Sequence, residues 1–238
     1  GVSSAASDVY KRQGPSRGGF YPPEPANVYV SNNAGLGWSL AGTCECGAIK
    51  RLVVQPNNSD VVWAAGDGGV RVSRDGGQTW SEDLLQDIAL RPEGATESSS
   101  MGLALHHGDP SIILAATTEV GMFRSTDGGK TWSATNDGID TKRLHHVVFA
   151  PSQPDIAYVA THQGVYRSDD AGQSWTPTSQ TMTYPFVTAI AVDPNNADIA
   201  YVGTASEVYT SHTSHFNPGL HEGEGLYKTN DGGKTWSR

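Results

Sequence analysis

The octapeptide Ser73-Arg-Asp-Gly-Gly-Gln-Thr-Trp80 recurs along the chain, and its repetition decides the fold. Close copies read Ser125-Thr-Asp-Gly-Gly-Lys-Thr-Trp132, Ser168-Asp-Asp-Ala-Gly-Gln-Ser-Trp175 and Thr229-Asn-Asp-Gly-Gly-Lys-Thr-Trp236. A degenerate fifth copy, Ser31-Asn-Asn-Ala-Gly-Leu-Gly-Trp38, precedes them. The five tryptophans stand roughly 40 to 60 residues apart, an interval typical of a four-stranded propeller blade with insertions.

The residues before each octapeptide repeat as well. Two apolar segments separated by a turn with Pro or Asn come first, as in residues 144–149 and 156–160. A third β-branched or aromatic segment then leads into the octapeptide, which turns the chain into a fourth strand near its Trp. We therefore expect an all-β fold, an incomplete propeller of four-stranded blades.

The residues of the octapeptide can be explained by a structural role alone, without a substrate. Its Asp can accept hydrogen bonds from backbone N–H groups of its own hairpin, and its glycines allow positive φ. Its Trp can pack between adjacent sheets. One Asp per turn falls short of the about six to eight oxygen ligands of calcium, so no metal is expected there. The structural residues are predicted to be Asp75, Trp80, Asp127, Trp132, Asp170, Trp175, Asp231 and Trp236.

These octapeptides resemble the Asp-box, also called the bacterial neuraminidase (BNR) repeat. Propellers with this motif include sialidases, xyloglucan-active hydrolases, sortilin-type receptors and photosystem II assembly factors. The resemblance covers residues 27–238 and is specific for the fold. The resemblance does not identify a function, because proteins that share such a fold often have unrelated functions.

The two ends of the chain suggest a metagenomic fragment of a longer propeller. Residues 1–13 resemble translated adapter sequence and are treated as a non-native lead, and residues 14–26 form a Pro/Gly-rich lead. Within residues 27–238, the first copy is expected to keep only its third strand and box, and the fifth copy to lack a fourth strand. We expect about four to five blades of a propeller of roughly six to eight or more, with closure of a five-bladed ring as the alternative.

The amino-acid composition indicates which classes of binding partner are unlikely for this chain. The net charge is −9 and no Lys/Arg cluster stands out, which argues against nucleic acid. No apolar run is long enough to span a membrane, and no cofactor is expected. The family resemblance implies a secreted, periplasmic or cell-surface protein. Cys44 and Cys46 would face the same side of a strand, where a bridge between them is strained, so we expect free thiols.

The face opposite the Asp boxes is where ligand sites of propellers usually lie. It carries the turns between second and third strands and the connections between blades, and we call it the candidate face. We predict that it binds ligand through Arg51, His145, His146 and His162. Insertions at about 81–99 and 205–224 lie on this face, and the second adds His212 and His215. Together with His221 and Glu222 they match no zinc signature, so a polar lid is expected rather than a metal site.

Two carboxylates of the candidate face raise the possibility of catalysis. Asp67 and Glu119 lie in second-to-third-strand turns of adjacent blades, where they could act as general acid and base in glycoside hydrolysis. Their segments look similar to the xyloglucanase segment that holds a catalytic Asp, although that family pairs its carboxylates across two propellers. The plainer interpretation is that they are exposed turn residues, and that His145 and His146 are a solvated strand start.

Two functions therefore remain open. The preferred one is a noncatalytic propeller that binds a protein or a polysaccharide. The alternative is a secreted glycoside hydrolase, xyloglucanase-like more than sialidase-like because no Arg-Ile-Pro motif occurs in the sequence.

Overall fold

The computed structural model of the chain describes residues 6–7, 25–66, 69–85, 102–118, 120–183, 186–205 and 225–238. All regular structure in these residues is β-strand, and none of them belongs to a helix long and apolar enough to cross a membrane. The strands are β1 (Ala6–Ser7), β2 (Ala26–Val30), β3 (Ser39–Cys44), β4 (Ile49–Val54), β5 (Val62–Gly66), β6 (Gly69–Ser73), β7 (Gly102–Leu105), β8 (Ile113–Ala116), β9 (Met122–Ser125), β10 (Ser133–Ala134), β11 (Leu144–Ala150), β12 (Gln153–Thr161), β13 (Gly164–Ser168), β14 (Thr176–Pro177), β15 (Val187–Asp193), β16 (Asn196–Thr204) and β17 (Leu226–Thr229).

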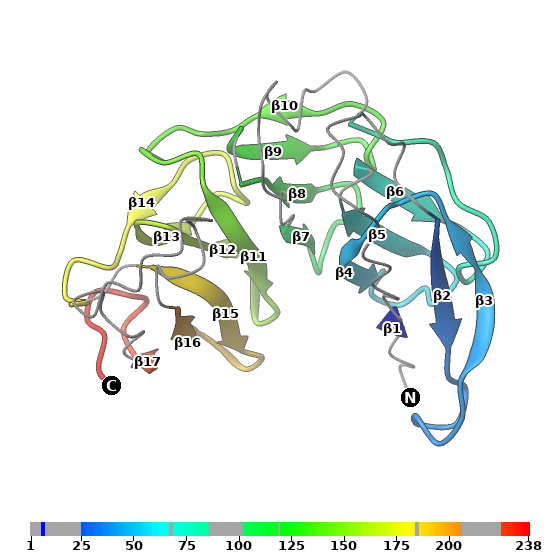
Figure 1. Ribbon diagram of the computed structural model, residues 1–238. Coiled ribbons are helices and arrows are strands. Elements are labelled where there is room, and N and C mark those ends of the chain that lie inside the picture. Colours follow the sequence, from blue (N-terminus) through cyan, green and yellow to red (C-terminus); the bar gives the residue numbers. More distant parts are fainter. Residues whose placement is uncertain are drawn as a thin grey trace, which may run out of the picture.

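Five antiparallel sheets form five successive blades. The first blade is β1–β3, the second β4–β6, the third β7–β10, the fourth β11–β14 and the fifth β15–β17. They are arranged as an open arc, with β4, β7, β11 and β15 on its inner side (Figure 1). Each of these inner strands contacts the inner strand of the neighbouring blade. The fold is therefore the incomplete propeller that the repeats predict.

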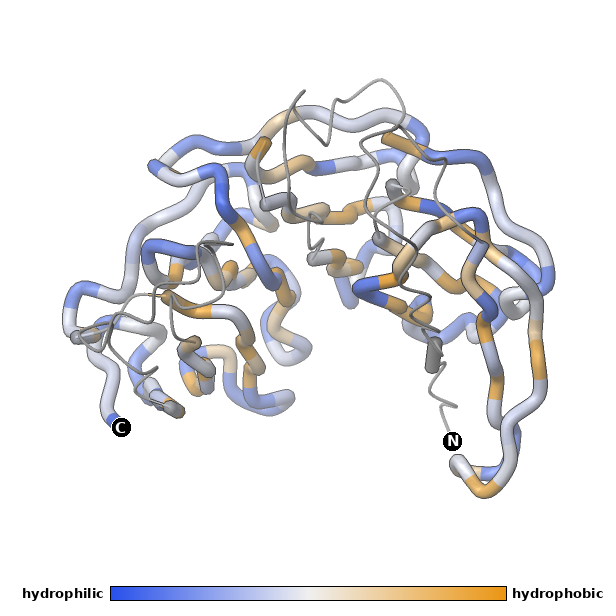
Figure 2. The backbone as a smooth tube through the Cα atoms, viewed as in Figure 1, coloured by the Kyte–Doolittle hydropathy of each residue, from blue (hydrophilic) through white to orange (hydrophobic). Residues whose placement is uncertain are grey.

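The apolar core is divided into clusters that lie between successive blades. Each cluster contains the box Trp of the later blade, and Figure 2 shows hydrophobic residues concentrated along the strands. The box Trp therefore packs between adjacent sheets. The four residues, in order along the arc, are Trp80, Trp132, Trp175 and Trp236.

The Asp boxes are hairpins stapled by their own side chains. In the second blade, the Asp75 carboxylate accepts the backbone N–H of Gln78 at 3.0 Å and that of Thr79 at 2.9 Å. The Thr79 hydroxyl donates to it at 2.6 Å, and this bond is the main cause that lowers the pKa of Asp75 to about 2. The degenerate box keeps part of the pattern, because Asn33 Oδ1 accepts the Gly37 N–H at 2.8 Å. The side-chain oxygens of Asp75 and Asn33 thus close their own hairpins.

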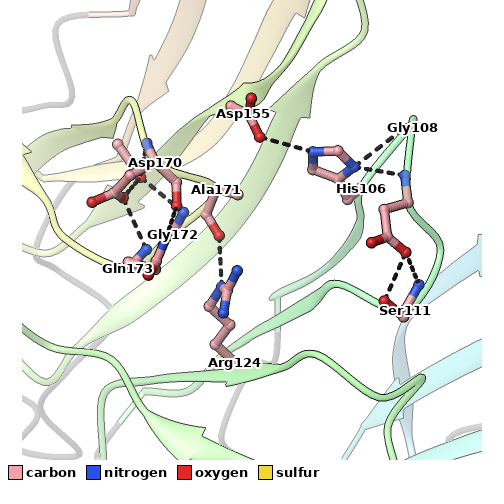
Figure 3. A network of polar contacts seen from close by, with 11 residues as sticks. His106, Gly108, Ser111, Arg124, Asp155, Asp170, Ala171, Gly172 and Gln173 are labelled. Carbon is pink, nitrogen blue, oxygen red and sulfur yellow. Dashed lines mark hydrogen bonds and ion pairs between the residues drawn. The ribbon is translucent and has the colours of Figure 1, made fainter.

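Polar contacts on the Asp-box side connect neighbouring blades. His106 of the third blade lies 3.4 Å from the Asp155 carboxylate of the fourth, and Arg124 Nε donates to Ala171 O at 2.9 Å (Figure 3). Arg167 makes the equivalent link between the fourth and fifth blades, with Nη1 2.8 Å from Asp198 Oδ1. These side chains therefore link the third blade to the fourth and the fourth to the fifth.

The ends of the arc differ from the sequence-based expectation. The first blade contains more than a third strand and a box, because β3 pairs with β2 after the box and β1 pairs on the other side. In the fifth blade, Lys228 and Ser237 exchange backbone hydrogen bonds of 2.7 and 2.9 Å, so a fourth strand begins there. The box hairpin itself brings the returning chain alongside the third strand. Most of the lead assigned to residues 1–13 lies outside the described residues, so that assignment stays a prediction.

The two cysteines form a disulfide, so the expectation of free thiols is wrong. Both Cys44 and Cys46 are buried, and their Cα atoms are 5.1 Å apart. Cys44 is the last residue of β3, and the chain bends at Glu45. Two cysteines face the same side only where the strand is extended across both residues, and the bend at Glu45 ends that extension.

Candidate binding face

Three turns of the candidate face are closed by the same type of side-chain hydrogen bond, from a threonine hydroxyl to a glycine carbonyl. Thr117, Thr161 and Thr204 hold equivalent positions where the second strand ends. Each hydroxyl donates to the carbonyl of a glycine at the start of the third strand or directly before it, at 2.9 to 3.1 Å. In the second blade the position is taken by Gly66, where a Cβ would approach Ala48 O at 2.4 Å. The turn that holds His162 is therefore closed by the Thr161 hydroxyl.

The inner strands carry a register irregularity at the start of this face. The pairing shifts between Ile49 and Arg51 in β4, between Leu144 and His146 in β11, and at the same point in β15. Such bulges re-aim side chains and are frequent next to functional sites. Arg51 and His146 occupy equivalent positions, as their pairing with Ala65 and Ala160 shows.

Arg51 and His146 contact each other along the inner side of the arc. The guanidinium Nη2 of Arg51 meets Nε2 of His146, although the third blade lies between their strands. In the third blade the equivalent position is Gly102, which pairs with Ala116. A Cβ at Gly102 would lie 2.9 Å from the Val147 nitrogen and 3.1 Å from the His146 Cα. The absence of a side chain at Gly102 keeps the inner strands close together at this point.

His146 is a partly buried residue rather than a solvated one. Its Nδ1 accepts the backbone N–H of Ile190 at 3.2 Å, which connects it to the fifth blade. Burial lowers the pKa of His146 to about 4, with the Arg51 charge as a second cause, and burial also lowers the pKa of Arg51. The expectation that His145 and His146 form a solvated strand start is wrong, because the His145 ring packs against Phe186 and the His146 ring contacts Arg51 and Ile190.

Three rings gather beside this pair. His162 and Phe186 have centroids 4.5 Å apart, and His145 lies 5.4 Å from Phe186 and 6.3 Å from His162. Burial lowers the pKa of His145 to about 4, followed by the effects of His162 and Arg143. The Nε2 atom of His145 is buried without a hydrogen-bond partner among the described residues. We call His145, His162 and Phe186 the ring cluster.

The structure thus brings the described predicted residues together in two adjoining groups. Arg51 pairs with His146, and His145 joins His162. In the described part of the chain, no group of three His, Cys, Asp or Glu side chains could hold a metal ion. Four other predicted site residues lie outside the described residues, namely Asp67, Glu119, His212 and His215.

Sequence reasoning missed Phe186 and Gly102. Phe186 directly precedes Val187, the first residue of an inner strand, so it lies in the connection between blades on the candidate face. Aligning Val187 with Leu144 would have placed it beside the histidines. Gly102 stands out only when the inner strands are superimposed, since it replaces the long side chains found at Arg51 and His146.

Comparison with known families agrees with this architecture. The family model named Sortilin-Vps10, described as sortilin, neurotensin receptor 3, matches residues 120–238, which is half of the chain. The chain belongs to the Sortilin-Vps10 family. A model of the BNR/Asp-box repeat also matches residues 71–82, the second box of this Sortilin-Vps10 family member.

Individual relatives of this Sortilin-Vps10 family chain are distant. It is 28% identical over 132 residues to an oligoxyloglucan reducing-end-specific xyloglucanase of Emericella nidulans, covering 50% of the chain and 15% of that protein. An ancestral GH74 enzyme superimposes with a TM-score of 0.65 at 20% identity, over 98% of the chain and 32% of the enzyme. A GH74 enzyme of Niastella koreensis gives 0.65 at 21% identity, over 90% of the chain and 34% of the enzyme. The chain thus spans a minor part of each relative.

Proposed function

We propose that the chain is part of a secreted or cell-surface propeller that binds a polysaccharide on the candidate face. The observation that carries this proposal is the ring cluster, in which three partly buried rings from two neighbouring blades lie within 6.3 Å of one another. Ligand sites are lined mainly by apolar and aromatic side chains with a few polar groups that fix orientation. The rings can pack against the apolar C–H face of a sugar.

The adjoining polar groups suit the hydroxyls of the same ligand. The guanidinium of Arg51 is a donor only, whereas the neutral imidazole of His145 can either donate or accept through its Nε2. The pKa of His145 and His146, lowered to about 4, keeps both rings neutral at physiological pH. The buried Nε2 of His145 would gain a partner from a bound hydroxyl. The likeness to a xyloglucanase makes a xyloglucan oligosaccharide the first ligand to test.

Isothermal titration calorimetry with xyloglucan oligosaccharides tests the proposal. We expect His162→Ala and Phe186→Ala each to weaken binding about tenfold, which is about 1.4 kcal/mol. Lys130→Ala is the matched control, because Lys130 is exposed in the third Asp box on the opposite side and should leave affinity unchanged. Binding that is indifferent to the ring cluster, or absent for xyloglucan and other polysaccharides, would contradict the proposal and favour a protein ligand.

Glycoside hydrolysis is the second candidate function, and the xyloglucanase likeness favours it. Asp67 lies between β5 and β6, and Glu119 lies between β8 and β9, in the turns that correspond to that of His162. Their roles as general acid and base stay predictions, since both lie outside the described residues.

Release of reducing sugar from xyloglucan would establish the second function. We expect Asp67→Asn and Glu119→Gln to abolish release while preserving oligosaccharide affinity, because each change keeps the size of the side chain and removes its charge. Lys130→Ala should leave the rate unchanged. Undiminished release in both acid variants would overturn the assignment of these residues, and no release by the wild type would leave binding alone.

A further inference from the structure

Two grooves on the Asp-box side lie at equivalent places between successive blades. One lies between the third and fourth blades and measures about 270 Å³, and the other lies between the fourth and fifth and measures about 590 Å³. Each is bounded by the third and fourth strands of one blade and by the box of the next. Arg124 lines the first groove and Arg167 lines the second, and each arginine directly precedes the first residue of its box.

Arg167 of the second groove is held by two carboxylates. Its Nη1 donates to Asp198 Oδ1 at 2.8 Å, and its Nε and Nη2 each lie 2.9 Å from Asp169 Oδ1. Nη1 also donates to the Tyr158 hydroxyl at 2.8 Å. The guanidinium is partly buried, and a charge removed from water needs partners of opposite sign. This position in a blade therefore takes anionic oxygens when they are within reach.

Arg124 of the first groove has neither of these carboxylates. Thr126 stands where the second groove has Asp169, one residue after the first residue of the box. Asp155 is the counterpart of Asp198, because the two carbonyls accept the equivalent backbone N–H from the box of their own blade. The Asp155 carboxylate lies beside a histidine of the third blade instead of the arginine (Figure 3). The first groove thus repeats the second without the anions.

The first groove is lined by hydrogen-bond donors that have no partner. Arg124 Nε donates to Ala171 O at 2.9 Å, which fixes the guanidinium, while no carboxylate of the described residues pairs with its Nη1 and Nη2. Thr126 and Ser133 add hydroxyls that donate to no other described residue, and Gln173 adds a side-chain amide. None of the residues that line this groove is acidic. The arrangement therefore offers several donors and one positive charge.

We propose that the groove between the third and fourth blades binds a small oxyanion group, a carboxylate or a tetrahedral oxyanion such as sulfate, on Arg124. The two Nη groups form the planar fork that binds two oxygens of one such group. The ligand would take the place that the Asp169 and Asp198 carboxylates fill on Arg167. The chain has a net charge of −9, so anions are not attracted to its surface in general. This site is separate from the candidate face and does not depend on the proposed function.

NMR titration of the ¹⁵N-labelled 238-residue chain tests the site with sodium sulfate and sodium acetate, at an ionic strength kept constant with sodium chloride. We expect saturable shifts of the amide signals of Thr126, Ser133 and Gln173, which line the groove. Tighter binding of acetate would identify a carboxylate ligand, and tighter binding of sulfate a tetrahedral one. Shifts that do not saturate with either salt, or that spread evenly over the surface, would overturn the proposal.

Two variants test the role of Arg124 in different ways. Arg124→Gln removes the guanidinium and should weaken binding about tenfold or more, because hydrogen bonds to charged groups are the strong ones. Thr126→Asp keeps Arg124 and supplies the carboxylate that Arg167 already has, so the added anion should no longer bind. Lys130→Ala is the matched control, since it removes an exposed cation of the same box that does not line the groove. Undiminished affinity in either groove variant would contradict the site.

The reverse change should create a second site. Asp169→Thr combined with Asp198→Asn removes both carboxylates from Arg167 and leaves the size of residue 198 unchanged. We expect this double variant to gain saturable shifts at Thr176 and Lys234, the counterparts of Ser133 and Gln173. A folded double variant that binds no anion in the second groove would show that missing carboxylates do not make the site.

Discussion

Arg51 on β4 contacts the imidazole of His146 on β11, although the third blade lies between the two strands. The third blade has Gly102 where its neighbours have these long side chains, so nothing projects between them from that position. His146 also accepts the Ile190 N–H from the fifth blade. The pair therefore couples the second, fourth and fifth blades on the inner side of the arc, beside the ring cluster.

We predict that Gly102→Ala destabilises the chain by about 1–3 kcal/mol, because the added Cβ overpacks the contact between β7 and β11. Its nearest atom would be the Val147 nitrogen at 2.9 Å. Gly203→Ala is the matched control, since a Cβ at that strand position meets only Ala189 Cβ at 3.8 Å. Urea unfolding measures both variants. Equal effects would show that the spacing of the inner strands does not depend on Gly102.

The second prediction concerns the hydrogen bond from Ile190 to His146. His146→Ala leaves the Ile190 N–H without its acceptor, and an unsatisfied buried donor costs about 1–3 kcal/mol. His146→Asn should recover part of that loss, because its amide oxygen can accept the same proton. Urea unfolding gives the free energies, and hydrogen exchange at the Ile190 amide should be faster in His146→Ala only. His107→Ala, an exposed position on the other side, serves as the control.

The third prediction is a loss of stability in mild acid. The pKa of both His145 and His146 is lowered from 6.5 to about 4, mainly by burial, so the unfolded chain binds more protons between these values. Stability is then fully present above pH 6.5 and falls as the pH drops toward 4. Urea midpoints across this range should fall less steeply in His145→Phe. A midpoint that is independent of pH between 7 and 4 would contradict the burial of the two rings.

The sequence predicts the fold well because each blade has the same short sequence pattern, and this pattern repeats along the chain. Asp75 accepts hydrogen bonds within its own hairpin, and Trp80 packs at one interface between blades. The octapeptide alone is therefore enough to predict both roles. The candidate face depends on contacts between blades, and these have no local signature. The pairing of Arg51 with His146, 95 residues apart, requires knowledge of what the intervening blade lacks. The role of Phe186 could not be predicted for the same reason, since its ring partners His145 and His162 belong to the fourth blade.

The last prediction concerns the Asp boxes at low pH. Hydrogen bonds from the Thr131 hydroxyl and the backbone lower the pKa of Asp127 from 3.8 to about 2. The ionised form is thus favoured in the folded hairpin, and its contribution is fully present above pH 4 and lost as the pH falls toward 2. Asp127→Asn should unfold with a smaller change of the urea midpoint across this window, because the amide oxygen accepts as Asn33 does and does not titrate.

Thr131→Ala separates the causes of that shift. Without its hydroxyl, the largest contribution is removed, and the pKa of Asp127 measured by carboxyl NMR titration should rise toward 3.8. Asp75 and Asp231, in unaltered boxes, provide internal controls whose pKa should remain near 2. A pKa of Asp127 that stays near 2 in Thr131→Ala would show that the backbone donors alone hold the carboxylate ionised, and the side-chain staple would then be dispensable.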